Sequence, residues 1–148
     1  MKLIFLDIDG VMNSAMGSEP YLADMEVSKL ELLKRIIDET QCDGIVLTSD
    51  RRYSSVYMNL FNEAINIFDI KLIGETRRPK EIDDELDDNR GKQIMDYLID
   101  SKNDIERMAI LDDNDEGISN LFDEVFIKVN RFYGLNEEIC AKIKMILE

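Results

Sequence analysis

Short apolar runs alternate along the chain with segments in which apolar residues recur at helical spacing. The apolar runs lie at Lys2–Leu6, Gly44–Leu47, Ile70–Ile73, Met108–Leu111 and Val125–Val129. Continuous apolar runs of this length are typical of strands that are buried on both faces. The alternation predicts an α/β fold, in which helices cover a parallel sheet of about five strands in a three-layer, Rossmann-like arrangement.

Helical periodicity predicts helices from Ser28, over Ser54–Phe68, from Asp88 or Asn89, near Gly117–Phe122 and from Asn136. Ser28 and Glu31 have the spacing of a capping box, in which the two side chains satisfy each other's backbone amides. The third helix is expected to bury a stripe made of Ile94, Met95, Leu98 and Ile99. The intervening segments 11–25 and 74–89 are expected to be loops.

Polar residues directly follow three of the predicted strands. Asp7 and Asp9 follow the first strand, Thr48 follows the second, and Asp112 and Asp113 follow the fourth. The carboxyl ends of parallel strands meet at one edge of a sheet, where ligands bind in open α/β folds. We therefore expect these side chains to lie close together.

Composition limits the function of this site. The chain has 148 residues, which favours one domain over 1–148, and its net charge of −14 argues against a general nucleic-acid binder. It has no histidine, so catalysis must use carboxylates, hydroxyls, lysine or arginine. No apolar run approaches the ~20 residues that span a bilayer, and charges occur too early for a signal peptide, so a cytoplasmic protein is expected.

Several carboxylates at one edge repel each other unless a cation lies among them. Oxygen ligands favour a hard ion such as Mg²⁺, which combines one or two carboxylates with water and substrate phosphate. In a phosphoryl transfer, Asp7 can attack phosphorus to form an aspartyl phosphate. Asp9 can protonate the leaving oxygen and later deprotonate water, while Thr48 donates its hydroxyl to a phosphoryl oxygen.

A cation at the start of the third helix can hold another phosphoryl oxygen. Arg90 lies four residues before Ile94 and therefore extends the inward stripe. Lys92 is rotated about 200° from Arg90 around the helix axis. Arg90 is the preferred residue, and Lys92 remains the alternative.

Four segments resemble the motifs of the haloacid dehalogenase (HAD) superfamily of phosphatases, in the same order. They are FLDIDGV at Asp7 and Asp9, VLTS ending at Thr48 and Ser49, RGK at Arg90, and ILDDND at Asp112 and Asp113. In addition, TSxxR from Thr48 to Arg52, RGKQIMDYL and GLNEEICAKI resemble HAD-type domains associated with Swiss-army-knife RNA repair proteins. Asp50 and Arg51 stand where those domains typically carry Ser-Trp.

The resemblance implies a HAD-like fold with a minimal cap, and hydrolysis of phosphate esters with Mg²⁺ as the cofactor. It implies that Mg²⁺ is held by Asp7, the backbone carbonyl of Asp9, Asp112 and Asp113. The open site would admit a polymer end, such as an RNA or DNA end, or a phosphoprotein, and a smaller phosphorylated molecule is a further alternative. Substrate contacts are expected from Ser49, Arg52 and Lys92, and from the wider basic cluster Arg51, Arg52, Arg77, Arg78 and Lys80.

Two other function classes are also compatible with the sequence. A non-catalytic HAD-like module that binds phosphate or a partner is the main alternative, and Asp50, a negative charge beside the phosphate-binding hydroxyl, favours it. A receiver-type signalling domain is a weaker alternative, because its acidic pair and its phosphoacceptor would follow different strands. The chain lacks a GxxxxGK[ST] phosphate-binding loop, which argues against a kinase.

Overall fold

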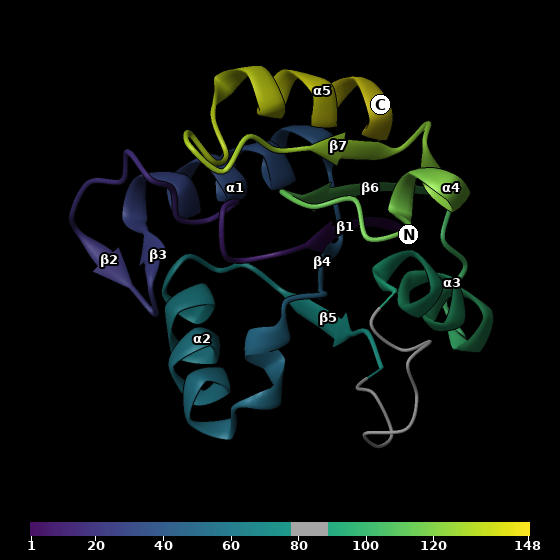
Figure 1. Cartoon of the computed structure of the whole chain (residues 1–148), viewed down its shortest axis with the longest axis horizontal. Helices are drawn as coiled ribbons and strands as arrows, with labels where there is room; N and C mark the ends of the chain where they lie inside the picture. Colours follow the sequence, from purple (N-terminus) through teal and green to yellow (C-terminus); the bar gives the residue numbers. More distant parts are fainter. Residues whose placement is uncertain (78–88) are drawn as a thin grey trace.

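The protein is described by a computed structural model that covers residues 1–77 and 89–148. Its main sheet has five strands in the order β5-β4-β1-β6-β7, and every neighbouring pair is parallel. The strands are β1 (Lys2–Leu6), β4 (Gly44–Leu47), β5 (Leu72–Glu75), β6 (Arg107–Asp112) and β7 (Phe126–Lys128). The predicted parallel α/β sheet is therefore confirmed (Figure 1).

Helices cover both faces of this sheet and create two separate apolar cores. The larger core joins β1 to α1 (Val27–Thr40), α2 (Ser55–Ile67) and α5 (Glu137–Leu147), and the smaller one joins β1 to α3 (Arg90–Asp100) and α4 (Ile118–Phe122). Ile4 and Leu6 face the larger core, whereas Leu3 and Phe5 face the smaller one. Both faces of β1 are therefore buried, as its continuous apolar run predicts.

The central position of β1 decides where the first polar residues go. Leu6, the last residue of β1, lies opposite Leu47 of β4 and Leu111 of β6. The chain therefore leaves the three middle strands at the same level of the sheet. Figure 1 shows α5 and α3 on opposite sides of these strands. None of the described helices is both long enough and apolar enough to cross a membrane.

Three local predictions are wrong. The capping box expected at Ser28 does not start the helix, because α1 begins at Val27 with Glu26 as its N-cap residue. The carboxylate of Glu26 makes no cap hydrogen bond and instead accepts from Ser14 and from the backbone of Ser18. Strand β5 begins at Leu72, two residues later than expected, because Asp69 adopts a left-handed turn after α2. Ile99, which was expected in the buried stripe of α3, is 72% exposed.

The first predicted loop also contains regular structure. Strands β2 (Tyr21–Leu22) and β3 (Met25–Glu26) form a small antiparallel hairpin within it. A 3₁₀ turn, η1 (Asp50–Tyr53), follows β4 and carries the first two basic residues of the expected cluster. Of the second predicted loop, residues 78–88 lie outside the described residues, and with them Arg78 and Lys80.

Candidate metal and phosphate site

Three carboxylates meet at the carboxyl ends of β1 and β6. Asp7 and Asp112 are almost completely buried, and one oxygen from each of Asp7, Asp112 and Asp113 lies within 4.8 Å of the others. The backbone N–H of Asp7 donates to the carbonyl of Leu111, which continues the pairing of the two strands into the site. The structure thus brings together three of the four aspartates that the sequence places at this edge.

A glycine after the first motif allows this close approach. Gly10 has a φ of +81°, a left-handed conformation that side chains disfavour. A Cβ atom at Gly10 would lie only 2.5 Å from Oδ2 of Asp113. The Asp-Gly pair therefore turns the chain and leaves room for the fourth-motif carboxylate.

Arg90 joins the carboxylates from the other side. Its Nη1 lies 2.9 Å from Oδ1 of Asp7 and 2.7 Å from Oδ2 of Asp112, and its Nε lies 2.9 Å from Glu116. Asn89 caps α3 by accepting from the backbone N–H of Lys92. The side chain of Lys92 is exposed on another face of the helix, so the geometry favours Arg90 over Lys92 as the cation beside Asp7.

The start of α3 comes close to the loop after β6. A Cβ atom at Gly91 would lie 2.3 Å from the carbonyl oxygen of Gly117, and one at Gly117 would meet the side chain of Asn89. Only glycines permit this contact between two backbones. The contact places Arg90, the residue before Gly91, against the buried carboxylates.

Burial and mutual repulsion disfavour the charged forms of these carboxylates. Burial, and then repulsion from Asp112, raises the pKa of Asp7 to about 8, although Arg90 acts in the opposite direction. Burial also raises the pKa of Asp112 to about 6. A divalent cation would offset the cost of burying these charges, and an all-oxygen donor set suits Mg²⁺. The residues present therefore fit the metal that the fold implies.

Asp9 lies apart from the three-carboxylate group. Its side chain is 58% exposed and forms two hydrogen bonds of 2.8 Å with Arg51, which also binds Asp24. Asn13 donates to the same carboxylate. The hydrogen bonds from Arg51 lower the pKa of Asp9, so this carboxylate is held in its charged form at the solvent side of the site.

Two residues that follow β4, Thr48 and Ser49, are held in place by backbone hydrogen bonds. The backbone N–H of Thr48 donates to the carbonyl of Leu6, which fixes Thr48 beside the residue before Asp7. Ser49 is buried, and its hydroxyl accepts from the backbone of η1 as the N-cap of that turn. These contacts set Thr48 at the same edge of the sheet as the carboxylates.

Arg52 has a different position from the one expected for a substrate contact. Its side chain is completely buried, and it donates to the carbonyls of Thr48, Ser49 and Thr76 and to the side chain of Gln93. The guanidinium therefore ties the ends of β4 and β5 to α3. This geometry indicates a structural role for Arg52.

Three residues of the site were not among the candidates drawn from the sequence. Asn13 and Asp24 come from the segment around the β2–β3 hairpin. Asn13 contacts Asp9, four residues earlier, whereas Asp24 contacts Arg51 across 27 residues, a separation that no local pattern reveals. Glu116 directly follows the ILDDND motif and lies four residues after Asp112. Asp24 and Glu116 contact the arginines Arg51 and Arg90, whereas Asn13 contacts the carboxylate of Asp9.

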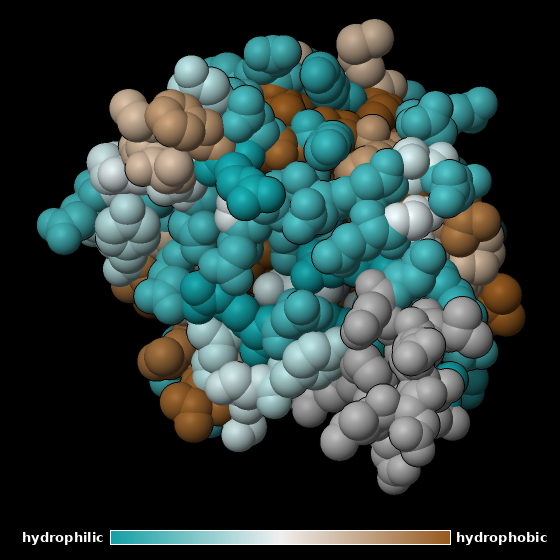
Figure 2. Space-filling model, viewed as in Figure 1, coloured by the Kyte–Doolittle hydropathy of each residue, from teal (hydrophilic) through white to brown (hydrophobic). Residues whose placement is uncertain are grey.

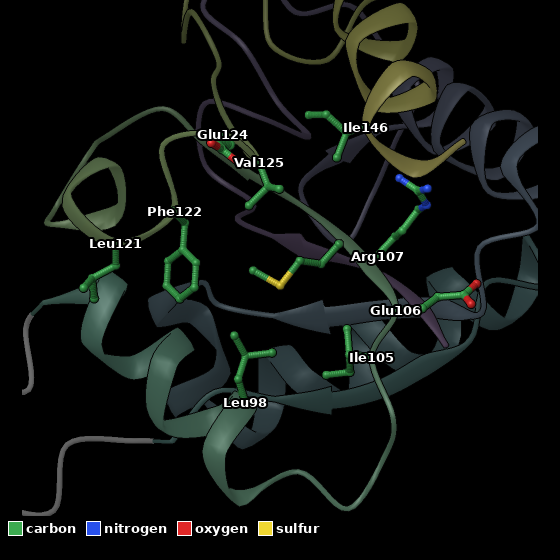
Figure 3. Close-up of a pocket in the computed structure, with 10 residues that line it drawn as sticks. Leu98, Ile105, Glu106, Arg107, Leu121, Phe122, Glu124, Val125 and Ile146 are labelled. Atoms are coloured by element: carbon green, nitrogen blue, oxygen red, sulfur yellow. The ribbon is translucent and has the colours of Figure 1, made fainter.

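A separate hollow lies away from this site. It has a volume of about 650 Å³ and is lined by the start of β6 and by α3, α4 and α5. In Figure 3 the side chains of Leu98, Ile105 and Phe122 converge on it. Asp112 is at the opposite end of β6, roughly 16 Å away at 3.3 Å per residue. Its lining is mostly apolar, with Glu106, Arg107 and Glu124 as the charged residues, and it includes none of the aspartates of the acidic group.

The parallel sheet, with its acidic edge and an arginine from the following helix, defines a HAD-type α/β domain. The sequence profile of the family described as "HAD domain in Swiss Army Knife RNA repair proteins" matches residues 3–140. The chain belongs to this family, as its four motifs predicted. No curated protein and no solved structure matches the chain.

Proposed function

We propose that this domain is a Mg²⁺-dependent phosphomonoester hydrolase that works through an aspartyl phosphate. The observation that carries the proposal is the group of Asp7, Asp112 and Asp113 with Arg90 across two of them, at the sheet edge where α/β folds bind ligands. Membership of a HAD family supports phosphatase-type chemistry.

Asp7, Asp112 and Asp113 would hold Mg²⁺, together with the backbone carbonyl of Asp9. When bound, the ion supplies positive charge that neutralises the phosphoryl oxygens and the nearby carboxylates. Arg90, already held between Asp7 and Asp112, can turn one of its donors to a phosphoryl oxygen. The Thr48 hydroxyl would donate to another oxygen.

Asp7 would attack phosphorus, and the bond to the leaving oxygen would break as Asp9 gives that oxygen a proton. Asp9 would then take a proton from water, whose oxygen attacks the aspartyl phosphate and releases inorganic phosphate. The exposed position of Asp9 suits both steps, because leaving group and water approach from the solvent side. The anionic state that Arg51 favours suits the second step, whereas the first step requires that Asp9 takes up a proton as its hydrogen bonds with Arg51 break on substrate binding.

The substrate we propose is a phosphorylated nucleic-acid end, with RNA favoured because the family is described from RNA repair proteins. A non-catalytic phosphate- or partner-binding module is the second candidate. Asp50 supports it, since its exposed carboxylate lies 3.6 Å from Arg90 and competes with phosphate for this cation.

Turnover of p-nitrophenyl phosphate with and without Mg²⁺ tests the reaction. The wild-type protein is expected to be active only with the metal, and Asp7→Asn to be inactive. Activity that survives this substitution would remove Asp7 as the nucleophile. Binding of Mg²⁺ without hydrolysis of any phosphomonoester would favour the binding module. A 3′-phosphorylated and a 5′-phosphorylated oligonucleotide, compared with a nucleotide panel, identify the substrate.

A further inference from the structure

Two exposed aromatic side chains stand on the loop that follows β7, next to the candidate site. Phe132 and Tyr133 are 47% and 56% exposed, and their rings contact each other edge to face with centroids 5.2 Å apart. Met16, on the loop after β1, is 64% exposed. We call Met16, Phe132 and Tyr133 the aromatic patch.

Backbone hydrogen bonds hold the patch in place. Ala15 and Met16 donate to the carbonyls of Arg131 and Phe132, and Leu135 donates to Val11. Asn130 accepts from the backbone of Phe132 through its side chain and from Gly134 through its carbonyl. Because the loop is fixed at both ends, the rings are exposed on a preorganised backbone rather than on a free tail.

The same loop reaches the acidic group. Arg131, the residue before Phe132, lies 3.9 Å from Oδ2 of Asp113 through its Nε, and most of its side chain is exposed. The backbone that carries Phe132 and Tyr133 therefore begins about one arginine side chain from Asp113. In Figure 2, hydrophilic surface over the centre of this face is bordered at the upper left by apolar surface, where the loop after β7 lies in Figure 1.

We propose that the aromatic patch binds the nucleobase of the terminal nucleotide whose phosphate is held at Asp7 and Arg90. This inference rests on the proposed function, since it takes that phosphate position as given. A nucleotide has a flat π-surface separated from its phosphate by a sugar, which matches an aromatic patch set back from the carboxylates by Arg131. The ring of an aryl phosphate would lie against Asp7 instead.

Recognition of a nucleobase by stacking is compatible with the strongly negative charge of the chain. A net charge of −14 gives little attraction for a long run of phosphates. Stacking on an aromatic side chain adds affinity without that attraction and tolerates any base. The patch would therefore recognise one terminal nucleotide, with weak preference among the four bases.

The test measures binding by calorimetry with Mg²⁺ and the Asp7→Asn protein, which lacks the proposed nucleophile. The ligands are nucleoside 3′- and 5′-monophosphates, with glycerol phosphate as the ligand that lacks a base. We expect at least one nucleotide to bind about five- to hundredfold more tightly than glycerol phosphate, the range that stacking of one base gives. Phe132→Ala/Tyr133→Ala in the same background should remove this preference and leave glycerol phosphate binding unchanged.

Two further variants separate stacking from other effects. Phe132→Leu/Tyr133→Leu keeps apolar bulk without rings and should lose most of the preference. Leu60→Ala/Ile67→Ala removes two exposed apolar side chains from α2 and should keep it. Equal binding of nucleotides and glycerol phosphate, or a preference that survives both patch variants, overturns the proposal. If the wild-type protein shows no turnover but this binding pattern holds, the proposed hydrolysis fails and the nucleotide site stands.

Discussion

At the scale of single residues, the site depends on carboxylates whose burial disfavours their charged form. Asp7 and Asp112 lose most of their hydration, and Arg90 compensates only in part, which is why their pKa values rise. Asp9 has the opposite situation, because it remains exposed and accepts two hydrogen bonds from Arg51. The two aspartates of the first motif therefore differ in charge preference although they are only two residues apart.

Asp7→Asn should stabilise the metal-free protein at pH 8. Folding raises the pKa of Asp7 from 3.8 to about 8, so the folded state holds a proton that the unfolded chain has released between these values. The free energy of unfolding therefore falls as pH rises through this window. Removing the titrating group should raise the melting temperature at pH 8 by at least roughly 2–4 °C, the shift that corresponds to 1 kcal/mol. The difference should shrink towards pH 4.

Asp9→Asn provides the matched comparison for this melting experiment. Arg51 lowers the pKa of Asp9, so the charged form contributes stability above the unfolded pKa and the contribution is lost as pH falls through the folded pKa. This variant should be slightly less stable than wild type at pH 8, with a small effect because solvent screens the pair. Stabilisation by both substitutions would show that general loss of negative charge, and not burial of Asp7, is the cause.

Arg90→Ala should lower kcat/KM by about 10²- to 10³-fold, because it removes a preorganised donor at the phosphoryl group. Lys92→Ala, two residues later on the exposed face of α3, should stay within about threefold of wild type. Steady-state kinetics with p-nitrophenyl phosphate and Mg²⁺ checks both, after melting curves show that each variant is folded. A larger loss in Lys92→Ala than in Arg90→Ala would reverse the assignment.

At the scale of elements, the position of Arg90 depends on how α3 meets the loop after β6. The capping residue Asn89 and the contact between Gly91 and Gly117 fix the first turn of the helix. The local sequence predicts the helix and its cap, but the glycine contact joins segments 26 residues apart and leaves no local pattern. The capping-box pattern at Ser28 failed because α1 already begins at Val27, with Glu26 as its N-cap residue, so Ser28 lies inside the first turn.

Gly91→Ala tests this arrangement. The new methyl group would meet the backbone of Gly117, which cannot move aside cheaply, so overpacking should cost about 1–3 kcal/mol of stability. Catalysis should fall as well, because Arg90 shifts away from Asp7. Ile99→Ala, on the exposed end of the same helix, should change neither property. Chemical denaturation and kinetics measure the two effects, and a neutral Gly91→Ala would contradict the close packing.

At the scale of the whole molecule, the sheet order brings the site together. Because β1 lies between β4 and β6, the sequence pattern of polar residues after apolar runs was enough to place Asp7, Thr48 and Asp112 at one edge. The pattern could not give the direction of each side chain. Asp9 was expected close to Asp7 because both follow the first strand, but β1 ends at Leu6 and the chain turns at Gly10.

Mg²⁺ should stabilise the whole fold by relieving repulsion at its centre. At a concentration about 100-fold above the dissociation constant, binding contributes about 2.7 kcal/mol, which corresponds to a rise in melting temperature of roughly 5–10 °C. Asp112→Asn/Asp113→Asn should abolish this rise. Asp43→Asn/Asp100→Asn removes two carboxylates away from the acidic group and should retain it. Equal shifts in both double variants would mean that the metal binds elsewhere.

As the proposed nucleophile, Asp7 should carry the phosphoryl group during turnover. The most direct measurement is mass spectrometry of peptides from protein quenched in acid during steady turnover with Mg²⁺. We predict a phosphoryl group on the peptide that contains Asp7, present in wild type and absent from Asp7→Asn. Sustained turnover with a phosphoryl group on another residue, or on none, would show that Asp7 is not the nucleophile.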